Sequence, residues 1–403
     1  MTSQVIHDDV LSFCSTYKGP KFHALLCDPP YELGFMDKAW DKSGIVFDPS
    51  TWEALTSHLL PGAFGMAFAS SRGWHRLACA IEDAGLRIHP SIFGWAFGSG
   101  FPKATRIKDS GAFEGHRYGL QALKPALEPI IVFQKPYEGK PVESIVETGA
   151  GALNIDGGRI PTNGEIVTIN TWDDGSKPFG DGAGHPFTGR EENKGRWPAN
   201  FYLGDEEAAR RLGEQSGAWT YGGSKTRQTW GQGGSLRDME PAPGISDTGT
   251  ASRFFFNVNR VLDEADPVLY CAKASRKERD AGLDCLAKDQ NEYRQYSKGR
   301  TLVNDEWKET GHKTTPRRNP HPTVKPIDLT RWLATLLLPP AEYAPRRIMV
   351  PFSGSGSEMI GAHLAGWEEI VGIEMEQEYV EIAEARLKHW TTNKGFTEEG
   401  LLD

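Results

Sequence analysis

The feature that most constrains the fold lies near the carboxyl end of the chain, where two short apolar runs flank a glycine-rich turn. Residues 347–350 are predicted as a strand, the turn Gly-Ser-Gly follows at 354–356, and a helix is expected up to Leu364. The next apolar run, 369–373, is predicted as a second strand that ends at Glu374. A strand, a glycine turn, a helix and a strand ending in an acidic residue form half of a nucleotide-binding fold.

Each part of this pattern has a use in binding a nucleoside. The glycines allow a tight turn and a close approach of a ligand to the backbone, and the following helix aims its N–H groups there. Glu374 stands 18 residues after Gly356, where a carboxylate can accept both ribose hydroxyls. The spacing lacks the motifs of dinucleotide binders and of nucleotide hydrolases, which favours an adenosyl group without a long phosphate tail. Taken alone, the turn is equally explained by a backbone that needs glycine.

A second motif, Asp28-Pro29-Pro30-Tyr31, follows the apolar run 22–27, which is predicted as a buried strand. The two prolines remove two N–H donors, so the motif presents acceptors: the Asp28 carboxylate and the prolyl carbonyls. Tyr31 adds an aromatic face. The motif therefore suits a planar ring that carries an –NH₂ group, although a proline-rich strand end with a capping Asp is the simpler interpretation of the motif in isolation.

The first 135 residues alternate between strand and helix patterns. Strands are predicted at 63–69, 88–97 and 129–133, and helices at 52–60 and 72–84. Such alternation indicates a mostly parallel sheet that is covered by helices on both faces.

The middle of the chain differs in composition. The stretch from Gly139 to Gly249 holds 22 of the 45 glycines and lacks long apolar periodic segments. Short elements are expected there, such as those at 199–203 and 206–212. We interpret this stretch as a loop-rich insertion with a separate function.

Composition excludes several classes of protein. No apolar run approaches the ~20 residues of a membrane helix, and the first residues lack the pattern of a signal peptide. The five cysteines form no CxxC pair, so neither a disulfide framework nor a structural zinc site is expected. We expect buried free thiols in a reducing cytoplasm instead. The net charge of −9 excludes a uniform electrostatic grip on nucleic acid but not a local basic face.

Together, DPPY at 28–31 and PFSGSGS at 351–357, with HPTVKP at 321–326, resemble the amino-group DNA methyltransferases that use S-adenosylmethionine. The motif order, with the catalytic motif first and the cofactor motif last, resembles the circularly permuted beta class. Phage and prophage members are similar in four further segments: ALKPALEPI, GALNIDGGRI, GRWPANF and YCAKASRKERDAGL.

The resemblance implies an α/β fold with a Rossmann-like S-adenosylmethionine-dependent methyltransferase sheet of about seven strands. The strands before Asp28 and before Pro351 are expected side by side. Three parts are expected: residues 1–139 with the catalytic motif, an inserted target-recognition region at 140–315, and the cofactor-binding part at 316–403.

The family's cofactor positions are carried over residue by residue, with one departure. The family usually has Asp directly before the Pro-Phe of the cofactor motif, whereas this chain has Val350, so a carboxylate is either missing or supplied by another residue, for example Asp28. A helix start with an exposed lysine is the alternative for Lys325. The expected cofactor-binding residues are Phe352, Ser353, Gly354, Ser355, Gly356, Ser357, Glu374, Met375, Thr323 and Lys325.

The implied reaction is a direct methyl transfer to a base flipped out of duplex DNA. Tyr31 would stack on the base, while Asp28 and the Pro29 carbonyl would accept its amino N–H bonds. No covalent intermediate is expected, since no Pro-Cys dipeptide is present, and no metal, since the histidines lack ligand spacing. Double-stranded DNA is the expected partner, with phosphate contacts from an acid-free stretch that contains Lys313, Arg317 and Arg318.

Several alternatives stay open. Asp at the head of the motif favours adenine N6 as the target, cytosine N4 is the alternative, and an RNA or protein-amide methyltransferase or a catalytically silent DNA-binding relative ranks behind. Cytoplasmic location in a bacterial or phage-infected cell is expected. A cognate restriction endonuclease, a monomeric or homodimeric state and the recognition sequence stay undetermined.

Overall fold

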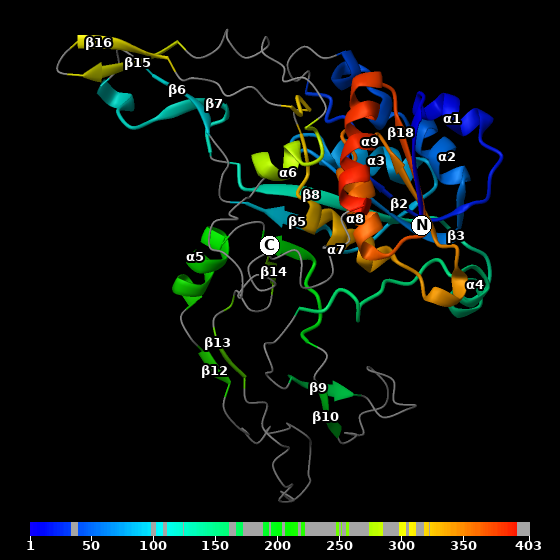
Figure 1. Cartoon of the computed structure of the whole chain (residues 1–403). Coiled ribbons are helices and arrows are strands. Elements are labelled where there is room, and N and C mark those ends of the chain that lie inside the picture. Colours follow the sequence, from blue (N-terminus) through cyan, green and yellow to red (C-terminus); the bar gives the residue numbers. More distant parts are fainter. Residues whose placement is uncertain are drawn as a thin grey trace, which may run out of the picture.

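The structure is a computed structural model of the 403-residue chain (Figure 1). It describes residues 1–33, 39–97, 102–107, 111–123, 125–160, 167–171, 188–192, 195–203, 206–216, 219–221, 247–249, 251, 255–257, 274–284, 298–303, 306–311, 318–321 and 323–392.

A ten-stranded sheet forms the centre of the molecule. Neighbouring strands are parallel except at β8, which runs antiparallel to its neighbours β3, β5 and β4. The predicted α/β fold with a large, mostly parallel sheet is therefore confirmed. The strands, in spatial order, are β1 (Thr2–His7), β18 (Glu369–Glu374), β17 (Arg347–Pro351), β2 (Phe22–Cys27), β3 (Leu59–Phe68), β8 (Leu127–Gln134), β5 (Phe93–Ala96), β11 (Phe201–Leu203) and β14 (Phe256–Asn257), with β4 (Arg87–Ile88) beside β8.

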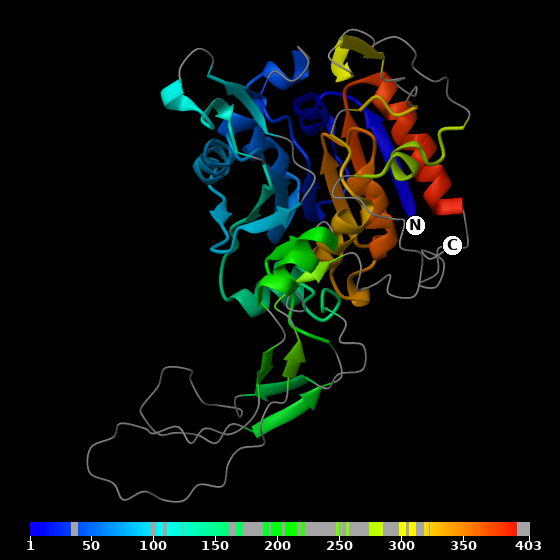
Figure 2. The same ribbon diagram turned by 90° about the vertical axis from the view of Figure 1, so that its left-hand side faces the viewer.

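Helices cover both faces of this sheet (Figures 1 and 2). Strand β2 is therefore buried on both sides, and all six of its residues are buried. Ala24 and Leu26 belong to one apolar cluster, whereas Leu25 and Cys27 belong to another, as the alternation of side chains along a strand requires. The first cluster includes α7 (Ile327–Leu337), α8 (Ser357–Ala365) and part of α9 (Gln377–Thr392), and the second includes α1 (Val10–Thr16), α2 (Pro49–Ser57) and α3 (Trp74–Asp83).

The sequence patterns located the strands around both motifs to within one residue at either end. The predicted strand 88–97 was wrong as a continuous element, because the chain leaves β4 at Ile88 and enters β5 only at Phe93. Pro90 lies in this break, where its missing N–H and fixed φ interrupt a ladder.

Strand β1 was missed by the sequence patterns. It is an edge strand of exposed and half-buried residues, and Val5 and Ile6 are its only strongly apolar ones. Its parallel pairing with β18 aligns His7 with Glu374. The two residues that follow, Asp8 and Asp9, are thereby placed beside the end of β18.

Residues of the glycine-rich middle extend the sheet and also form separate small elements. β11 pairs in parallel with β5, and β14 pairs with β11.

No helix among the described residues has the length and apolar character needed to cross a membrane. The remaining described strands and α-helices are the pairs β6 (Lys103–Arg106) with β7 (Arg117–Gln121), β9 (Val167–Thr171) with β10 (Thr188–Glu192), β12 (Trp219–Tyr221) with β13 (Asp247–Gly249) and β15 (Lys298–Val303) with β16 (Glu306–Gly311), and the helices α4 (Pro141–Thr148), α5 (Glu206–Ser216) and α6 (Arg276–Asp280).

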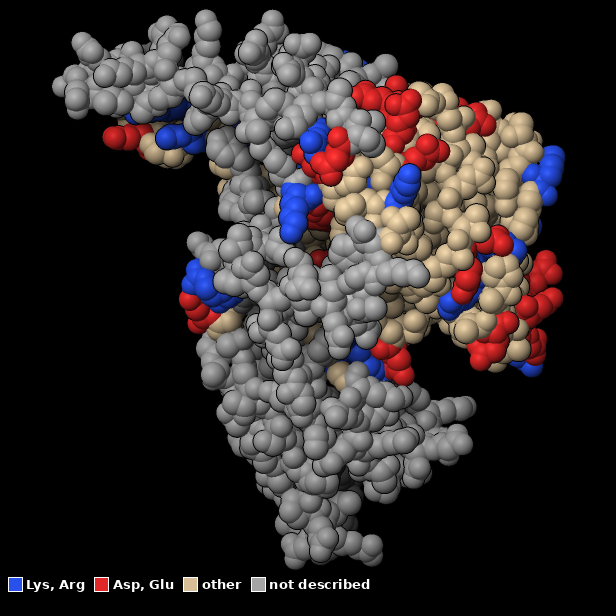
Figure 3. Space-filling model, viewed as in Figure 1, with Lys and Arg blue, Asp and Glu red and all other residues tan. Residues whose placement is uncertain are grey.

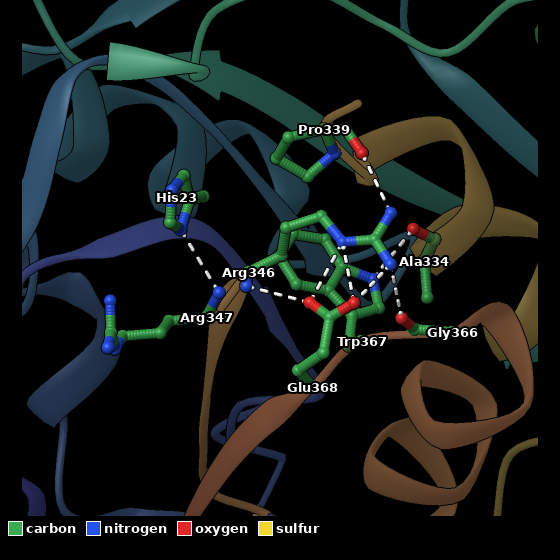
Figure 4. Close-up of polar contacts among 8 residues, drawn as sticks. All are labelled: His23, Ala334, Pro339, Arg346, Arg347, Gly366, Trp367 and Glu368. Atoms are coloured by element: carbon green, nitrogen blue, oxygen red, sulfur yellow. Dashed lines mark hydrogen bonds and ion pairs between the residues drawn. The ribbon is translucent and has the colours of Figure 1, made fainter. Parts of the chain in front are cut away.

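A polar cluster centred on Arg346 fastens the sheet at the amino-terminal end of β17 (Figure 4). The Arg346 guanidinium donates to the Glu368 carboxylate and to the carbonyls of Pro339 and Gly366, at 3.0 and 2.9 Å. The Arg346 backbone N–H donates to the same carboxylate, at 2.7 Å. Nearby, the Trp367 indole donates to the Ala334 carbonyl at 3.0 Å. The connections of β17 to α7 and to β18 are thus tied at one point.

Candidate active site

The two motifs meet at the carboxyl-terminal edge of the sheet. β2 and β17 are parallel neighbours, with Ala24 aligned to Ile348 and Leu25 to Met349. The segment that follows β2 begins at Asp28, and the segment that follows β17 begins at Phe352. The expectation that these two strands lie side by side is confirmed, and residues more than 320 positions apart share one edge.

A cavity of about 330 Å³ lies at this edge. Segments from four parts of the chain line it, which fits the rule that open α/β sheets bind ligands beyond the carboxyl ends of their strands. Of the residues expected to bind the cofactor, Thr323 and Met375 line this cavity and are exposed. Five others are buried outside its lining: Lys325, Ser353, Ser355, Gly356 and Ser357. The lining residues that carry the argument are Asp28, Pro29, Pro30 and Tyr31; Phe352, Gly354, Glu374 and Met375; Asp8 and Asp9; and His321, Thr323 and Tyr379.

The turn after β17 adopts an unusual backbone. Phe352, Gly354 and Gly356 have φ values of 56°, 50° and 80°, in the left-handed region that costs little only for glycine. At Gly354, an added Cβ would also lie 2.7 Å from His321 Nε2. Glycine is therefore required at 354 by both conformation and space, whereas Phe352 holds a strained conformation at the wall of the cavity.

Glu374 locks this turn. It is almost completely buried, its Oε2 accepts the Gly354 N–H at 2.8 Å, and its Oε1 accepts the Glu376 N–H at 2.9 Å. Burial raises the pKa of Glu374, and these N–H bonds oppose that rise. Each carboxylate oxygen keeps a second lone pair, so acceptors facing the cavity are compatible with the lock.

Arg386 also supports the turn, through its two serines Ser355 and Ser357, and sequence reasoning missed it. Its side chain is completely buried, and its Nη1 donates to Ser355 Oγ and Ser357 Oγ at 3.0 and 3.2 Å. Burial lowers its pKa to about 10, so it stays charged at neutral pH. The signal was present in the sequence, because Arg386 falls at helical spacing in line with the apolar residues Tyr379 and Ile382.

The Asp28 carboxylate lies in a buried charge cluster. Lys325 Nζ donates to Asp28 Oδ2 at 2.6 Å and lies 3.7 Å from Glu128 Oε2. Tyr31 donates its hydroxyl to Glu128 Oε2 at 3.1 Å. Lys325 Nζ also lies 5.1 and 4.9 Å from the ring centroids of Tyr31 and Phe68, within cation–π distance.

The second oxygen of the Asp28 carboxylate, Oδ1, lacks the hydrogen bond that Lys325 donates to Oδ2. Among the described residues, none donates to Asp28 Oδ1, although this atom is buried. Burial raises the pKa of Asp28, and the Lys325 ammonium pulls it back down. For Lys325, burial alone would lower the pKa, but the carboxylates of Asp28 and Glu128 raise it, so the lysine stays charged. A buried acceptor without a partner is costly, and a ligand that brings a donor to Asp28 Oδ1 would remove that cost.

Glu358 adds a third carboxylate to this cluster. It lies in the first turn of α8, is 3% exposed, and its Oε1 has no hydrogen-bond partner among the described residues. Burial, followed by the nearby Asp28 charge, raises its pKa to about 7, while Lys325 opposes the rise. Sequence reasoning did not single out Glu128 or Glu358, because neither stands in a motif that predicts burial.

The neighbouring walls contain other residues that sequence reasoning did not assign. Asp9 caps α1 by accepting the Leu11 N–H at 2.9 Å, and Asp8 Oδ1 accepts the Asp9 N–H at 2.8 Å. The His321 ring packs edge-on against Tyr379, with centroids 4.6 Å apart. Burial and the nearby cation Lys325 lower the pKa of His321 to about 3, so this imidazole is neutral.

The position where the family usually has Asp offers no carboxylate. Val350 is completely buried in the apolar cluster that contains α7 and α8. The carboxylates in the cavity wall come instead from Asp28, Glu374, Asp8 and Asp9, together with Asp41 and Glu376.

The expected DNA-binding residues are only partly placed. Lys313 and Arg317 lie outside the described residues. Arg318 forms an ion pair with Asp284 and is about one-quarter exposed.

No family model matches the chain, and no curated protein matches its sequence. Solved structures that are similar include M1.HpyAVI in complex with SAM, with 13% identity, a TM-score of 0.39, and coverage of 96% of this chain and 99% of that one. PvuII DNA methyltransferase, which is cytosine-N4-specific, is 10% identical with a TM-score of 0.41, and the match covers 99% of this chain and 89% of that one. TTHA0409 from Thermus thermophilus, complexed with S-adenosyl-L-methionine, is 10% identical with a TM-score of 0.39, and the match covers 97% of this chain and 96% of that one. These likenesses are distant, so the function is argued from the chain's own residues.

Proposed function

We propose that this protein is a site-specific DNA methyltransferase that transfers a methyl group from S-adenosylmethionine to the exocyclic amino group of a flipped-out base, adenine N6. One observation carries the proposal: a single cavity is lined both by Asp28-Pro29-Pro30-Tyr31 and by Phe352 and Gly354 of the glycine turn, together with Glu374. The first group suits a planar amine and the second suits a nucleoside, so the two reactants would meet at one sheet edge.

The residues around the glycine turn fit S-adenosylmethionine. The Gly354 backbone lines the cavity, and the His321 ring fills the space that a Cβ at this position would need. Glu374 would accept the ribose hydroxyls while its bonds to the turn keep it in place, and Met375 and Thr323 would contact the cofactor from the rim. When bound, the cofactor supplies an electrophilic methyl group on a positively charged sulfur.

The residues around Asp28 fit the target amine. Asp28 Oδ1 is the buried acceptor that lacks a donor among the described residues, and an amino N–H of the base would satisfy it. The Pro29 carbonyl would accept the second N–H. The Tyr31 ring would stack on the base, and its orientation is fixed by the hydroxyl bond to Glu128. These contacts hold the nitrogen lone pair toward the methyl group, and orientation of this kind supplies much of a rate enhancement.

Lys325 acts as a positioning residue in this scheme. It occupies Asp28 Oδ2 and leaves Oδ1 to the substrate. As the new carbon–nitrogen bond forms and the carbon–sulfur bond breaks, the nitrogen becomes positively charged and loses a proton. Asp28 would stabilise that charge and accept the proton, which is then released to water. The protein therefore contributes placement and an anionic environment, and needs no covalent intermediate.

The finer assignments belong to the same proposal. We place the chain in the permuted beta class of phage and prophage type, with residues 1–139 and 316–403 forming the methyltransferase domain and residues 140–315 reading the DNA target. Lys313, Arg317 and Arg318 would contact phosphates, Arg318 by exchanging its Asp284 partner for a phosphate.

Nucleoside mass spectrometry tests the proposal, on DNA from methylation-deficient cells that express either the protein or its Asp28→Ala variant. N6-methyladenine that disappears with the variant is the expected result. N4-methylcytosine would overturn the choice of base and keep the mechanism. The absence of any modified base, together with no calorimetric binding of S-adenosylmethionine by the purified protein, would overturn the proposal as a whole.

A further inference from the structure

The β6–β7 hairpin leaves the sheet beside the buried charge cluster that contains Asp28 and Glu128. It is inserted between β5 and β8, whose last ladder pairs include Trp95 with Glu128. Just beyond them, the Phe97 N–H donates to the Ala126 carbonyl at 3.0 Å and closes the base of the insertion. Because Glu128 accepts the Tyr31 hydroxyl, the hairpin is rooted at the edge of the sheet that bears the cavity. Figure 1 shows β6 and β7 projecting away from the central sheet.

The hairpin places two like charges directly opposite each other. Its register aligns Arg106 with Arg117, and both side chains are exposed. Like charges at opposed positions of an antiparallel pair destabilise it. Within the described part of the chain neither arginine forms an ion pair, and Arg117 Nη1 donates only to the His116 carbonyl, at 2.8 Å. The folded hairpin thus keeps a repulsion that a bound anion would relieve.

The local charge is opposite in sign to that of the whole chain. The described hairpin residues 103–106 and 111–121 contain three exposed basic side chains, Lys103, Arg106 and Arg117, and one acidic side chain, Glu114. The chain as a whole carries −9. In Figure 3, blue side chains lie at the upper left, over the projecting hairpin, together with red ones. Exposed aromatic rings accompany them, with Tyr118 57% and Phe113 49% exposed. Arginines next to aromatic rings suit the phosphates and sugars of a nucleic acid.

We propose that the β6–β7 hairpin is a DNA-contacting arm in which Arg106 and Arg117 bind backbone phosphates of the duplex beside the flipped base. This inference rests on the proposed function and adds a contact outside the 140–315 region. It also explains why the hairpin grows from the strand connection nearest to Glu128: an arm rooted there grips the duplex next to the nucleotide that enters the cavity.

The test compares the wild-type protein with an Arg106→Gln/Arg117→Gln double variant and a matched control, Lys18→Gln/Lys21→Gln. The control removes the same charge from exposed positions before β2, at the opposite edge of the sheet. Binding to a fluorescein-labelled DNA duplex is measured over a series of salt concentrations. For the hairpin variant, we expect the Kd to rise about tenfold and the slope of log K against log salt to shrink by about 2, since each lost phosphate contact removes about 0.9. The control should match the wild type.

Two further measurements separate the outcomes. The hairpin variant should unfold at the same temperature as the wild type or at a higher one, because a repulsive pair is removed, and should bind S-adenosylmethionine unchanged. An unchanged salt slope, in a wild type that methylates DNA, would overturn the hairpin contact alone. Conversely, salt-dependent DNA binding that the variant weakens, in a wild type without methylation activity, would overturn the proposed function and uphold the arm.

Discussion

The two ends of the central sheet contrast in how their buried polar groups are treated. At the amino-terminal end of β17, the Arg346 guanidinium is bound by the Glu368 carboxylate and two backbone carbonyls (Figure 4). At the carboxyl-terminal edge, Asp28 and Glu358 each keep a buried oxygen without a donor among the described residues, and Phe352 holds a left-handed backbone. The same strands connect both ends.

The difference teaches where this molecule is built for stability and where it is built for a ligand. Satisfied charge pairs at chain connections hold the strands in register, whereas unsatisfied acceptors and backbone strain cost free energy and persist where function uses them. Substitutions at the Arg346 end should therefore lower stability and leave activity unchanged. Substitutions at the Asp28 end should lower activity, and removing the charge of a carboxylate that keeps an unpartnered oxygen, as at Glu358, should leave stability unchanged or raise it.

The largest effect is expected from Asp28→Asn. The amide keeps the shape of the side chain but loses the negative charge and the proton acceptor, so kcat should fall by about 100- to 10,000-fold. Single-turnover transfer of labelled methyl groups to DNA measures the loss, and calorimetry checks that S-adenosylmethionine still binds. A variant that retains wild-type turnover would remove Asp28 from the mechanism.

Arg346→Met tests the opposite end. The change leaves the partly buried Glu368 without its charge partner, and we expect a loss of about 2–4 kcal/mol in the free energy of unfolding. Arg347→Met is the matched control, because its more exposed pair with Glu369 should contribute no more than about 1 kcal/mol. Urea unfolding measures both. Equal losses from the two variants, or a lowered turnover per folded molecule, would contradict the contrast.

Glu358→Gln should stabilise the protein at alkaline pH. In the folded chain the pKa of Glu358 is raised to about 7 from 4.5, so its contribution to stability is fully present below pH 4.5 and is lost as the pH rises through 7. A neutral amide avoids that loss, which at about 1.4 kcal/mol per pH unit amounts to about 3 kcal/mol by pH 8. Unfolding at pH 5 and pH 8 gives the comparison. A variant that is less stable at pH 8 would mean that the ionised carboxylate is favourably paired.

The smallest and most specific effects concern the two groups that set the proton affinity of Asp28. Lys325→Met removes the cation and should move the acidic limb of the pH profile of kcat/KM to higher pH. Glu128→Gln removes a negative charge, keeps an acceptor for Tyr31 and should move that limb to lower pH. The charge of Asp28 also acts on Cys27, Tyr31 and Glu358, which are unchanged in both variants. Shifts in the same direction would indicate general loosening of the site.

Local patterns in the sequence predicted much of the frame. The apolar run before Asp28, the glycine turn and the strand before Glu374 each follow from residues within one element, because strand and turn preferences act over a few residues. The edge strand β1 was missed, since an edge strand needs only a partly apolar pattern. The break at Pro90 was missed because apolar residues continue on both sides of it.

The sequence by itself determined which residue types stand at the ends of β2, β17 and β18, and hence the kind of ligand that each end suits. Only the tertiary structure decided that Lys325 reaches Asp28 across 297 positions, that Glu128 binds Tyr31, and that Arg386 lies under the glycine turn. The physical reason is that a buried charge is stable only beside its partners, and those partners become neighbours through the parallel register of the strands. Helical spacing can indicate that a charged residue such as Arg386 is buried, but spacing along the chain carries no signal for which residue becomes its partner.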